Sequence, residues 1–234
     1  RKWETFQLSQ QSFKINSLST WDQNTFFVGG EQGVSLFWHN ELKETYKDMG
    51  ELNDVVVKVV FIAPDSILWL GTTQGVIRSI KKPNLQNLGN PNLKDPTTWE
   101  VFSTSENPGL PSDTINSIIV HLNEIWVGTA RGVAKYTADT WIEQNTGWSD
   151  PPQVNQLLSY QDTLVVATPQ GIYLFSGNQW KQFPADSLKS TKITAVLIDE
   201  KQRFWAGTQD QGLFLFNNQF WEEIKINRPW NSYV

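Results

Sequence analysis

The chain has 234 residues, long enough to bury a sizeable core, and it carries a net charge of −5 with a pI near 5.1. This acidic balance, with no basic cluster larger than Lys81 and Lys82, argues against nucleic-acid binding. The absence of cysteine excludes disulfides, thiolate metal sites and cysteine nucleophiles, and no apolar run approaches the roughly 18 residues of a membrane-spanning helix.

The first predicted element is an outer strand at residues 1–7, RKWETFQ, and five copies of one pattern follow it. Each copy has two strands joined by a tight turn that ends in glycine. The copies are TFFVGGEQGVSLF (25–37), ILWLGTTQGVIRSI (67–80), EIWVGTARGVAKY (124–136), TLVVATPQGIYLF (163–175) and RFWAGTQDQGLFLF (203–216). Alternating apolar residues, rich in β-branched and aromatic types, predict strands, and no stretch has helical periodicity with caps.

Each copy is flanked by two further predicted strands. The upstream segments are INSL at Ile15, VVKV at Val56, INSI at Ile115, VNQL at Val154 and ITAV at Ile193. The downstream segments begin at Trp99, Trp141, Trp180 and Trp221, and Leu42 takes this place in the first copy. Four antiparallel strands in about forty residues make one blade of a β-propeller. The sequence therefore predicts an all-β propeller of four-stranded antiparallel blades, with five repeats visible.

One glycine recurs in the turn between the second and third strands of every copy. Glycine adopts positive φ at no steric cost, so we expect that conformation at this position. The five turn glycines are Gly33, Gly75, Gly132, Gly171 and Gly212. In the third copy, strands are predicted at residues 115–120, 125–128, 133–136 and 141–144.

The stretch GLPSDTINSI (109–118), followed by EIWVGTARGVAKY and TWIEQ, resembles the repeat of the two-component regulator propeller (Reg_prop) family. All five copies match its W-x-G-T-x-x-G core at least in part. Three departures are Val166-Ala167-Thr168 in place of W-x-G-T, Gly30 in place of the threonine, and Gln211 as an extra residue. The resemblance covers nearly the whole chain. It implies the periplasmic sensor region of a hybrid two-component system, or an exported protein.

The number of strands leaves two arrangements open. We predict a single propeller domain over residues 1–234, with repeats near 8–48, 49–104, 105–146, 147–185 and 186–226. The strand at residues 1–7 would close a ring only if the last repeat lacked an outer strand, but FWEEIKI (220–226) supplies one. The chain is therefore either part of a larger propeller, the arrangement we favour, or a five-bladed ring with a spare strand. A partial propeller would expose edges through which it could dimerise.

The sequence offers little catalytic chemistry. His39 and His121 are expected to be exposed turn residues, and neither has a second ligand at metal-binding spacing, so we predict no metal and no cofactor. The usual hydrolase, phosphate-loop, dinucleotide and zinc-protease motifs do not occur. Adjacent carboxylates such as Asp199 and Glu200 point opposite ways along a strand. We therefore do not expect an enzyme.

A binding surface is expected on the face that carries the glycine turns and the connections between blades. The residues before each turn glycine are polar, and such groups suit hydrogen bonds to sugars or a carboxylate. Arg131 is the only cation among them, and Trp148, in the connection NTGWSDPPQ, is the best stacking platform. The predicted ligand-binding residues are Gln32, Gln74, Arg131, Trp148, Gln170 and Asp210. The alternative is that these turns are polar only because they are hydrated.

Three functions are compatible with these patterns. The first is an extracytoplasmic, periplasmic sensor that binds a small polar ligand or saccharide, without nucleic-acid binding or direct membrane insertion. The second is a protein-interaction scaffold in a secretion or surface assembly, for which the insertion at residues 81–98, on the opposite face, is one candidate contact. The third is a lyase resembling the streptogramin lyases, but no histidine lies at a glycine turn or a connection between blades. Since the chain starts at Arg1, we expect a processed or excised piece.

Overall fold

The computed structural model describes residues 14–83, 92–183, 188 and 192–225. In these residues, twenty strands form five separate four-stranded antiparallel sheets, and a short 3-10 helix, η1 (Pro96–Thr98), precedes one strand. The predicted outer strand at residues 1–7 and the middle of the insertion, residues 84–91, lie outside the described residues. The all-β prediction with four-stranded antiparallel blades is confirmed.

The five sheets, called blades 1 to 5, follow chain order. Blade 1 contains β1 (Ile15–Thr20), β2 (Thr25–Gly30), β3 (Gly33–Trp38) and β4 (Glu41–Tyr46). Blade 2 contains β5 (Val57–Ile62), β6 (Leu68–Thr72), β7 (Val76–Ser79) and β8 (Trp99–Phe102). Blade 3 contains β9 (Ile115–His121), β10 (Glu124–Thr129), β11 (Gly132–Thr137) and β12 (Thr140–Glu143). Blade 4 contains β13 (Gln156–Tyr160), β14 (Thr163–Thr168), β15 (Gly171–Ser176) and β16 (Gln179–Gln182). Blade 5 contains β17 (Ile193–Ile198), β18 (Phe204–Thr208), β19 (Leu213–Phe216) and β20 (Trp221–Glu223).

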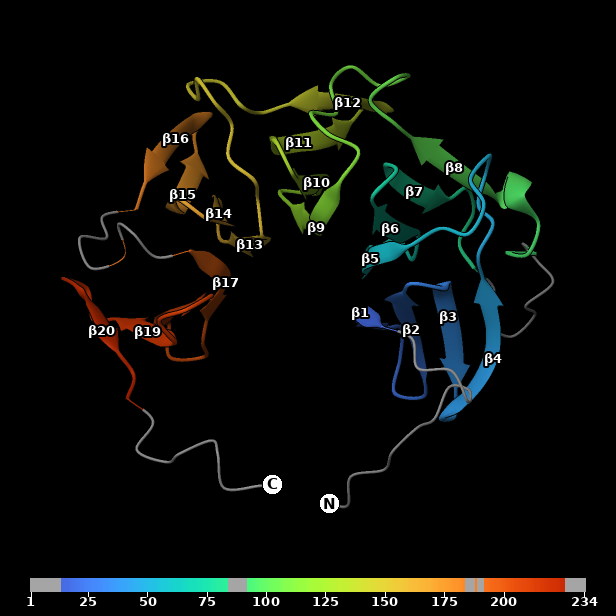
Figure 1. Ribbon diagram of the computed structural model, residues 1–234, viewed down its shortest axis with the longest axis horizontal. Helices are drawn as coiled ribbons and strands as arrows, with labels where there is room; N and C mark the ends of the chain where they lie inside the picture. The colour runs from blue at the N-terminus through green and yellow to red at the C-terminus, as the bar shows by residue number, and fades with distance from the viewer. Residues whose placement is uncertain (1–13, 84–91, 184–187, 189–191, 226–234) are drawn as a thin grey trace.

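The blades stand around a common centre, with the first strand of each blade innermost (Figure 1). The innermost strands lie next to one another in chain order, β1 beside β5, β5 beside β9, β9 beside β13, and β13 beside β17. Figure 1 also shows that the series does not close, because an opening separates blade 5 from blade 1. The described blades thus form an open arc rather than a closed five-bladed ring.

The strand register corrects one predicted start. Val57, not Val56, takes the position of Ile115, because Val57 pairs with Thr72 as Ile115 pairs with Thr129. In the third copy the observed strands extend the predicted ones by one residue at six of the eight ends, and β12 ends one residue earlier than predicted. Elsewhere the alternation of apolar and polar residues predicted the strand positions well. In VVVKV (55–59) three valines stand in a row, so alternation does not show which of them begins the strand.

His121 is not the exposed turn residue that the sequence predicted. The turn between β9 and β10 consists only of Leu122 and Asn123, both with positive φ, so His121 remains in the strand. Its side chain is 2% exposed. The ring lies edge-on to Trp126, and Nδ1 is 2.9 Å from the hydroxyl of Ser159 in blade 4. A two-residue turn therefore moves this histidine into the contact between blades 3 and 4.

The recurring G-T-x-x-G pattern closes the turn between the second and third strands. The Thr129 hydroxyl donates to the Gly132 carbonyl at 3.0 Å and accepts from the Arg131 N–H at 3.0 Å. Thr72, Thr168 and Thr208 make the same pair of contacts in their blades. All five turn glycines have positive φ as predicted, 90° at Gly33, 123° at Gly75, 95° at Gly132, 125° at Gly171 and 82° at Gly212.

Apolar cores lie between successive blades rather than within them. Trp69 of blade 2 packs in one core with Ile115 and Val127 of blade 3, and Trp126 of blade 3 packs with Val154 of blade 4. Most tryptophans at strand positions are core residues, as predicted, with at most 4% of the side chain exposed at Trp69, Trp99, Trp126, Trp141 and Trp221. Each blade therefore depends on its neighbours for burial of its apolar faces.

Side chains of the innermost strands also cross to the next blade. Asn16, Asn116 and Asn155 donate to the carbonyls of Val57, Val154 and Ile193, at 3.0, 2.8 and 2.6 Å. One residue further on, Ser17, Ser117 and Gln156 accept from the N–H groups of Val60, Leu157 and Val196, at 3.0, 3.0 and 2.8 Å. We call each such pair of side chains an interblade clamp. The clamps satisfy backbone groups that would otherwise be buried without partners.

Candidate functional site

The five glycine turns lie at one end of the strands, as the sequence predicted. The N–H groups of Glu31, Ala130 and Gln209 donate to the carbonyl of the residue that precedes the innermost strand of the same blade, at 3.3, 2.9 and 3.0 Å. The turns of blades 1, 3 and 5 therefore lie beside the connections that enter their blades. Because the strands are antiparallel, the other two turns of each blade lie at the opposite end.

Neither of the two hollows found among the described residues collects the six predicted ligand-binding residues. Gln74, Arg131, Gln170 and Asp210 are exposed, and Gln32 and Trp148 are partly buried. The five turn residues come from five different blades, and within the described residues no hydrogen bond or ion pair joins the side chains of any two of the six. Only Trp148 lines either of the two hollows described below.

Trp148 forms one wall of a groove on the outer strands of blade 4. Its ring stacks on Trp180, with centroids 4.3 Å apart and an angle of 28° between the planes, and it meets Tyr173 edge-on at 5.3 Å. We call this hollow the aromatic groove. Its volume is about 480 Å³, and it is lined by Thr146, Gly147, Trp148, Tyr173, Asn178, Gln179, Trp180 and Gln182.

The connection that carries Trp148 is held on both sides. Asn145 is 7% exposed; it accepts from the Val133 N–H at 2.8 Å and donates to the Arg131 carbonyl at 3.1 Å. The Trp148 N–H donates to the Asn145 carbonyl at 3.0 Å. The indole N–H of Trp180 donates to the Gln144 carbonyl at 2.6 Å, which ties the same connection to blade 4. The two indole rings are thus positioned by buried polar contacts before any ligand binds.

The groove follows β16 along its length. At one end Gln182 donates to the carbonyl of Gln170, so the groove reaches the glycine turn of blade 4. At the other end are Asn178 and Gln179, where β16 begins. The ring of Trp148 therefore lies on the rim of the arc rather than over the glycine turns, because it packs on the outer strands of blade 4.

The aromatic groove contains groups that the sequence reasoning missed. Trp180 aligns with the buried Trp141 and Trp221, and it was expected to be core, but it is only partly buried. The available signal was the presence of Trp148 one connection earlier, which gives Trp180 a stacking partner. None of the lining residues carries a charge. Aromatic faces beside uncharged amides suit a neutral polar ligand with an apolar face, such as a sugar ring.

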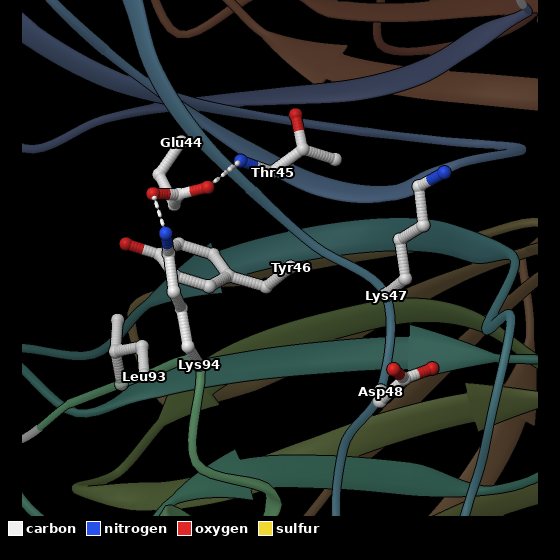
Figure 2. Close-up of a pocket in the computed structure, with 7 residues that line it drawn as sticks. All are labelled: Glu44, Thr45, Tyr46, Lys47, Asp48, Leu93 and Lys94. Atoms are coloured by element: carbon white, nitrogen blue, oxygen red, sulfur yellow. Dashed lines mark hydrogen bonds and ion pairs between the residues drawn. The ribbon is translucent and has the colours of Figure 1, made fainter.

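A second hollow, of about 280 Å³, lies where the end of the insertion meets blade 1 (Figure 2). Lys94 pairs with Glu44 at 2.5 Å, and Leu93 is 3% exposed against the core of blades 1 and 2. Burial, together with the nearby Glu44 carboxylate, raises the pKa of Tyr46 to about 12. Two of the charged side chains at this hollow, Lys94 and Glu44, are thus paired with each other. This described end of the insertion packs against the protein's own surface.

Metal centres and membrane-spanning helices are two further features that can indicate how a protein works. Across the described ranges, no group of three or more histidine, aspartate or glutamate side chains is placed to hold a metal ion. The same ranges contain no helix that is both long and apolar enough to span a membrane.

Comparisons with known proteins give structural likeness without sequence likeness. No family model matches the sequence, and no curated protein matches it. The extracellular domain of BT4673 from B. thetaiotaomicron, described as a hybrid two-component system, superposes with a TM-score of 0.73 at 21% identity. This match covers 95% of the chain and 29% of that domain. The extracellular domain of BT3049, described in the same way and from the same organism, gives 0.65 at 16% identity, over 88% of the chain and 28% of that domain.

A lyase also shares the fold. Virginiamycin B lyase from Staphylococcus aureus, in a complex with quinupristin, superposes with a TM-score of 0.69 at 12% identity, over 96% of the chain and 74% of the lyase. The lyase in that complex is a catalytically inactive variant in which one histidine is replaced by alanine. At these identities the likeness establishes the propeller fold and leaves activity open. The chain spans less than a third of the length of the two sensor domains.

Proposed function

We propose that the chain is a ligand-binding propeller from the extracytoplasmic part of a two-component sensor, and that its ligand is a small neutral saccharide. The observation that carries this proposal is the aromatic groove, where three aromatic rings adjoin three side-chain amides with no charged group. The likeness to two extracellular sensor domains supports the extracytoplasmic, periplasmic location. The glycine turn of blade 4 extends the same surface through Gln170.

We consider the lyase function less well supported. The inactive lyase variant shows that a histidine matters for catalysis in that protein. In this chain His39 is exposed in the turn between β3 and β4, and His121 is buried at the end of β9. Both lie at the end of the strands opposite the glycine turns. Neither histidine lines the aromatic groove, so we propose a binding function rather than an enzymatic one.

The scaffold function rested partly on the insertion at residues 81–98. Its described end is occupied by internal contacts, since Pro96 accepts from the Gly50 N–H at 2.9 Å and Lys94 pairs with Glu44. This segment therefore joins blade 2 to blade 1. The internal role favours the sensor over the scaffold as the function to test first.

The test is a screen of neutral oligosaccharides by thermal shift, followed by calorimetry with variants of the groove. We expect Trp148→Ala to weaken binding by about tenfold or more, because it removes a stacking surface worth about 1–2 kcal/mol. Gln182→Ala removes one neutral hydrogen-bonding group and should weaken binding by about three- to tenfold. Lys82→Ala, at the opposite end of the strands, is the control and should leave the affinity unchanged.

Two outcomes would contradict the proposal. One is a saccharide whose affinity responds to Lys82→Ala and not to the groove variants. The other is a ligand that binds equally well to Trp148→Ala and to the unmodified protein. Because Trp148 also packs on Trp180, the thermal midpoint of each variant without ligand must be measured first, so that a loss of fold is not mistaken for a loss of contact.

A further inference from the structure

Blade 1 exposes two apolar positions that every other blade buries. Ile15 and Leu18 of β1 are 53% and 59% exposed. The positions equivalent to Ile15 are Val57, Ile115, Val154 and Ile193, and each is 0% exposed. The positions equivalent to Leu18 are Val60, Ile118, Leu157 and Val196, which are 5, 6, 3 and 3% exposed. The repeat thus keeps the apolar residue type in blade 1 but lacks the partner that covers it.

The equivalent residues show what that partner is. Ile115 packs in the core that contains Trp69 of the preceding blade, and Val154 packs in the core that contains Trp126 of its preceding blade. Each of these first-strand residues is therefore covered by the blade before it in the chain. No described blade precedes blade 1, and blade 5 lies across the opening of the arc (Figure 1).

The polar contacts at the junctions agree with the apolar ones. In three of the four junctions an interblade clamp of the preceding blade bonds to the carbonyl at the position of Ile15 and to the N–H at the position of Leu18. The face of β1 therefore presents the same kinds of apolar side chains and backbone groups as the faces of blades 2 to 5 that pack on a preceding blade. An exposed pair of large apolar residues in such an arrangement marks an interface.

We propose that the face of blade 1 formed by Ile15 and Leu18 docks a further propeller blade, whose innermost strand carries an asparagine followed by serine or glutamine. Blade 5, from this chain or from a second copy, fits less well, because Thr194 and Ala195 occupy its clamp positions. The sequence WETF at residues 3–6 matches WEVF of β8, so the sequence predicts the outer strand of another blade ahead of blade 1.

One junction shows what can replace the clamp. Blade 2 has Lys58 and Val59 at the clamp positions, and there Lys58 bonds to Asn116 while Arg78 lies over the rings of blades 2 and 3. Blade 5 has Thr194 and Leu215 at the positions of Lys58 and Arg78, and the Thr194 hydroxyl donates to the Gly207 carbonyl of its own blade at 3.2 Å. The proposed occupant is therefore an additional blade with the clamp, not the fifth blade.

The experiment grafts blade 3 onto this face. Residues 109–153, which include Asn116 and Ser117, are joined directly to Ile15, so that Ile15 takes the place that Val154 has in the native junction. Hydrogen exchange of the Leu18 amide is then compared between the graft and the unmodified chain. We expect exchange about tenfold slower or more in the graft, because the amide gains a partner inside a packed junction. A matched graft with Asn116→Ala and Ser117→Ala in the added blade only should lose most of this protection.

The outcomes separate the additional blade from its alternatives. Slower exchange that depends on the grafted clamp supports the proposal. Unchanged exchange at Leu18, or a grafted blade that proteases remove, overturns it, because the same blade packs on the equivalent face of blade 4. A second copy would give a concentration-dependent dimer of the unmodified chain that Leu18→Glu abolishes. That result, with Leu18 protected in the dimer, would also overturn the proposal.

Discussion

The turn glycine of blade 3 has no room for a side chain. Its φ is 95°, and a Cβ atom there would lie 2.0 Å from the Oδ1 atom of Asn145. Asn145 cannot move away freely, because it bonds to both Val133 and Arg131. We expect Gly132→Ala to lower the free energy of unfolding by about 2–4 kcal/mol, as the sum of backbone strain and lost buried hydrogen bonds. Urea denaturation measures the change.

The matched control for Gly132→Ala is Gly212→Ala. Gly212 occupies the same turn in blade 5 with a φ of 82°, but a Cβ atom added there would meet open space, with no contact within 4 Å. Only the backbone strain of about 1–2 kcal/mol should then be lost. Equal losses at the two positions would show that the contact with Asn145 is not what requires glycine.

Burial lowers the pKa of His121, although the nearby carboxylates of Asp162 and Glu124 act in the opposite direction. The pKa of a histidine side chain in an unfolded chain is about 6.5. Because the native pKa is lower, the unfolded chain binds more protons below that pH, so stability is full above about 6.5 and falls as the pH decreases further. We expect the free energy of unfolding to drop as the pH falls below about 6.5.

The measurement for this pH dependence compares two histidine variants. His121→Gln removes the titrating group, so its stability should change less over this range than that of the unmodified chain. His39→Gln, in an exposed turn, is the matched control. If His121→Gln keeps the full dependence, the proton is taken up elsewhere, for example at carboxylates with native hydrogen bonds.

At the scale of strands and blades, most of the fold could be predicted because its requirements are local. The turn glycines and the alternating apolar residues are visible within a dozen residues of each other, and they set the strands almost to the residue. The clamps were visible only as the recurring letters INS. Their bonds reach a different blade, as between Asn116 and Val154, which are 38 residues apart. No local pattern reports such a contact.

The candidate groove could be predicted only in part, for a similar reason. Trp148 stood out because it lies in a connection and not in a strand. Its partners Tyr173 and Trp180 have ordinary strand positions, and the repeat alignment assigned Trp180 to the core. Whether such a ring is covered depends on the path of the preceding connection, which Asn145 fixes through buried hydrogen bonds. The sequence alone does not specify that path.

At the scale of the whole molecule, stability depends on contacts between nearest neighbours. Blades 2, 3 and 4 each share an apolar core with two other blades, whereas blades 1 and 5 each share only one within the described arc. In such arrays the end units open more easily than the central ones. Blade 5 should be the weaker end, since its outer strand β20 has only three residues, whereas the outer strand β4 of blade 1 has six.

Hydrogen exchange of the unmodified chain tests this gradient. We expect amides in β18 and β19 of blade 5 to exchange about tenfold faster or more than those in β10 and β11 of blade 3, because opening blade 5 breaks one interface and opening blade 3 breaks two. The compared strands occupy the same places in their blades, so differences in local hydrogen bonding largely cancel. Equal protection across all five blades would show that the arc unfolds as a single cooperative unit. In that case the open faces of blades 1 and 5 would have to be covered in solution, by each other or by a second molecule.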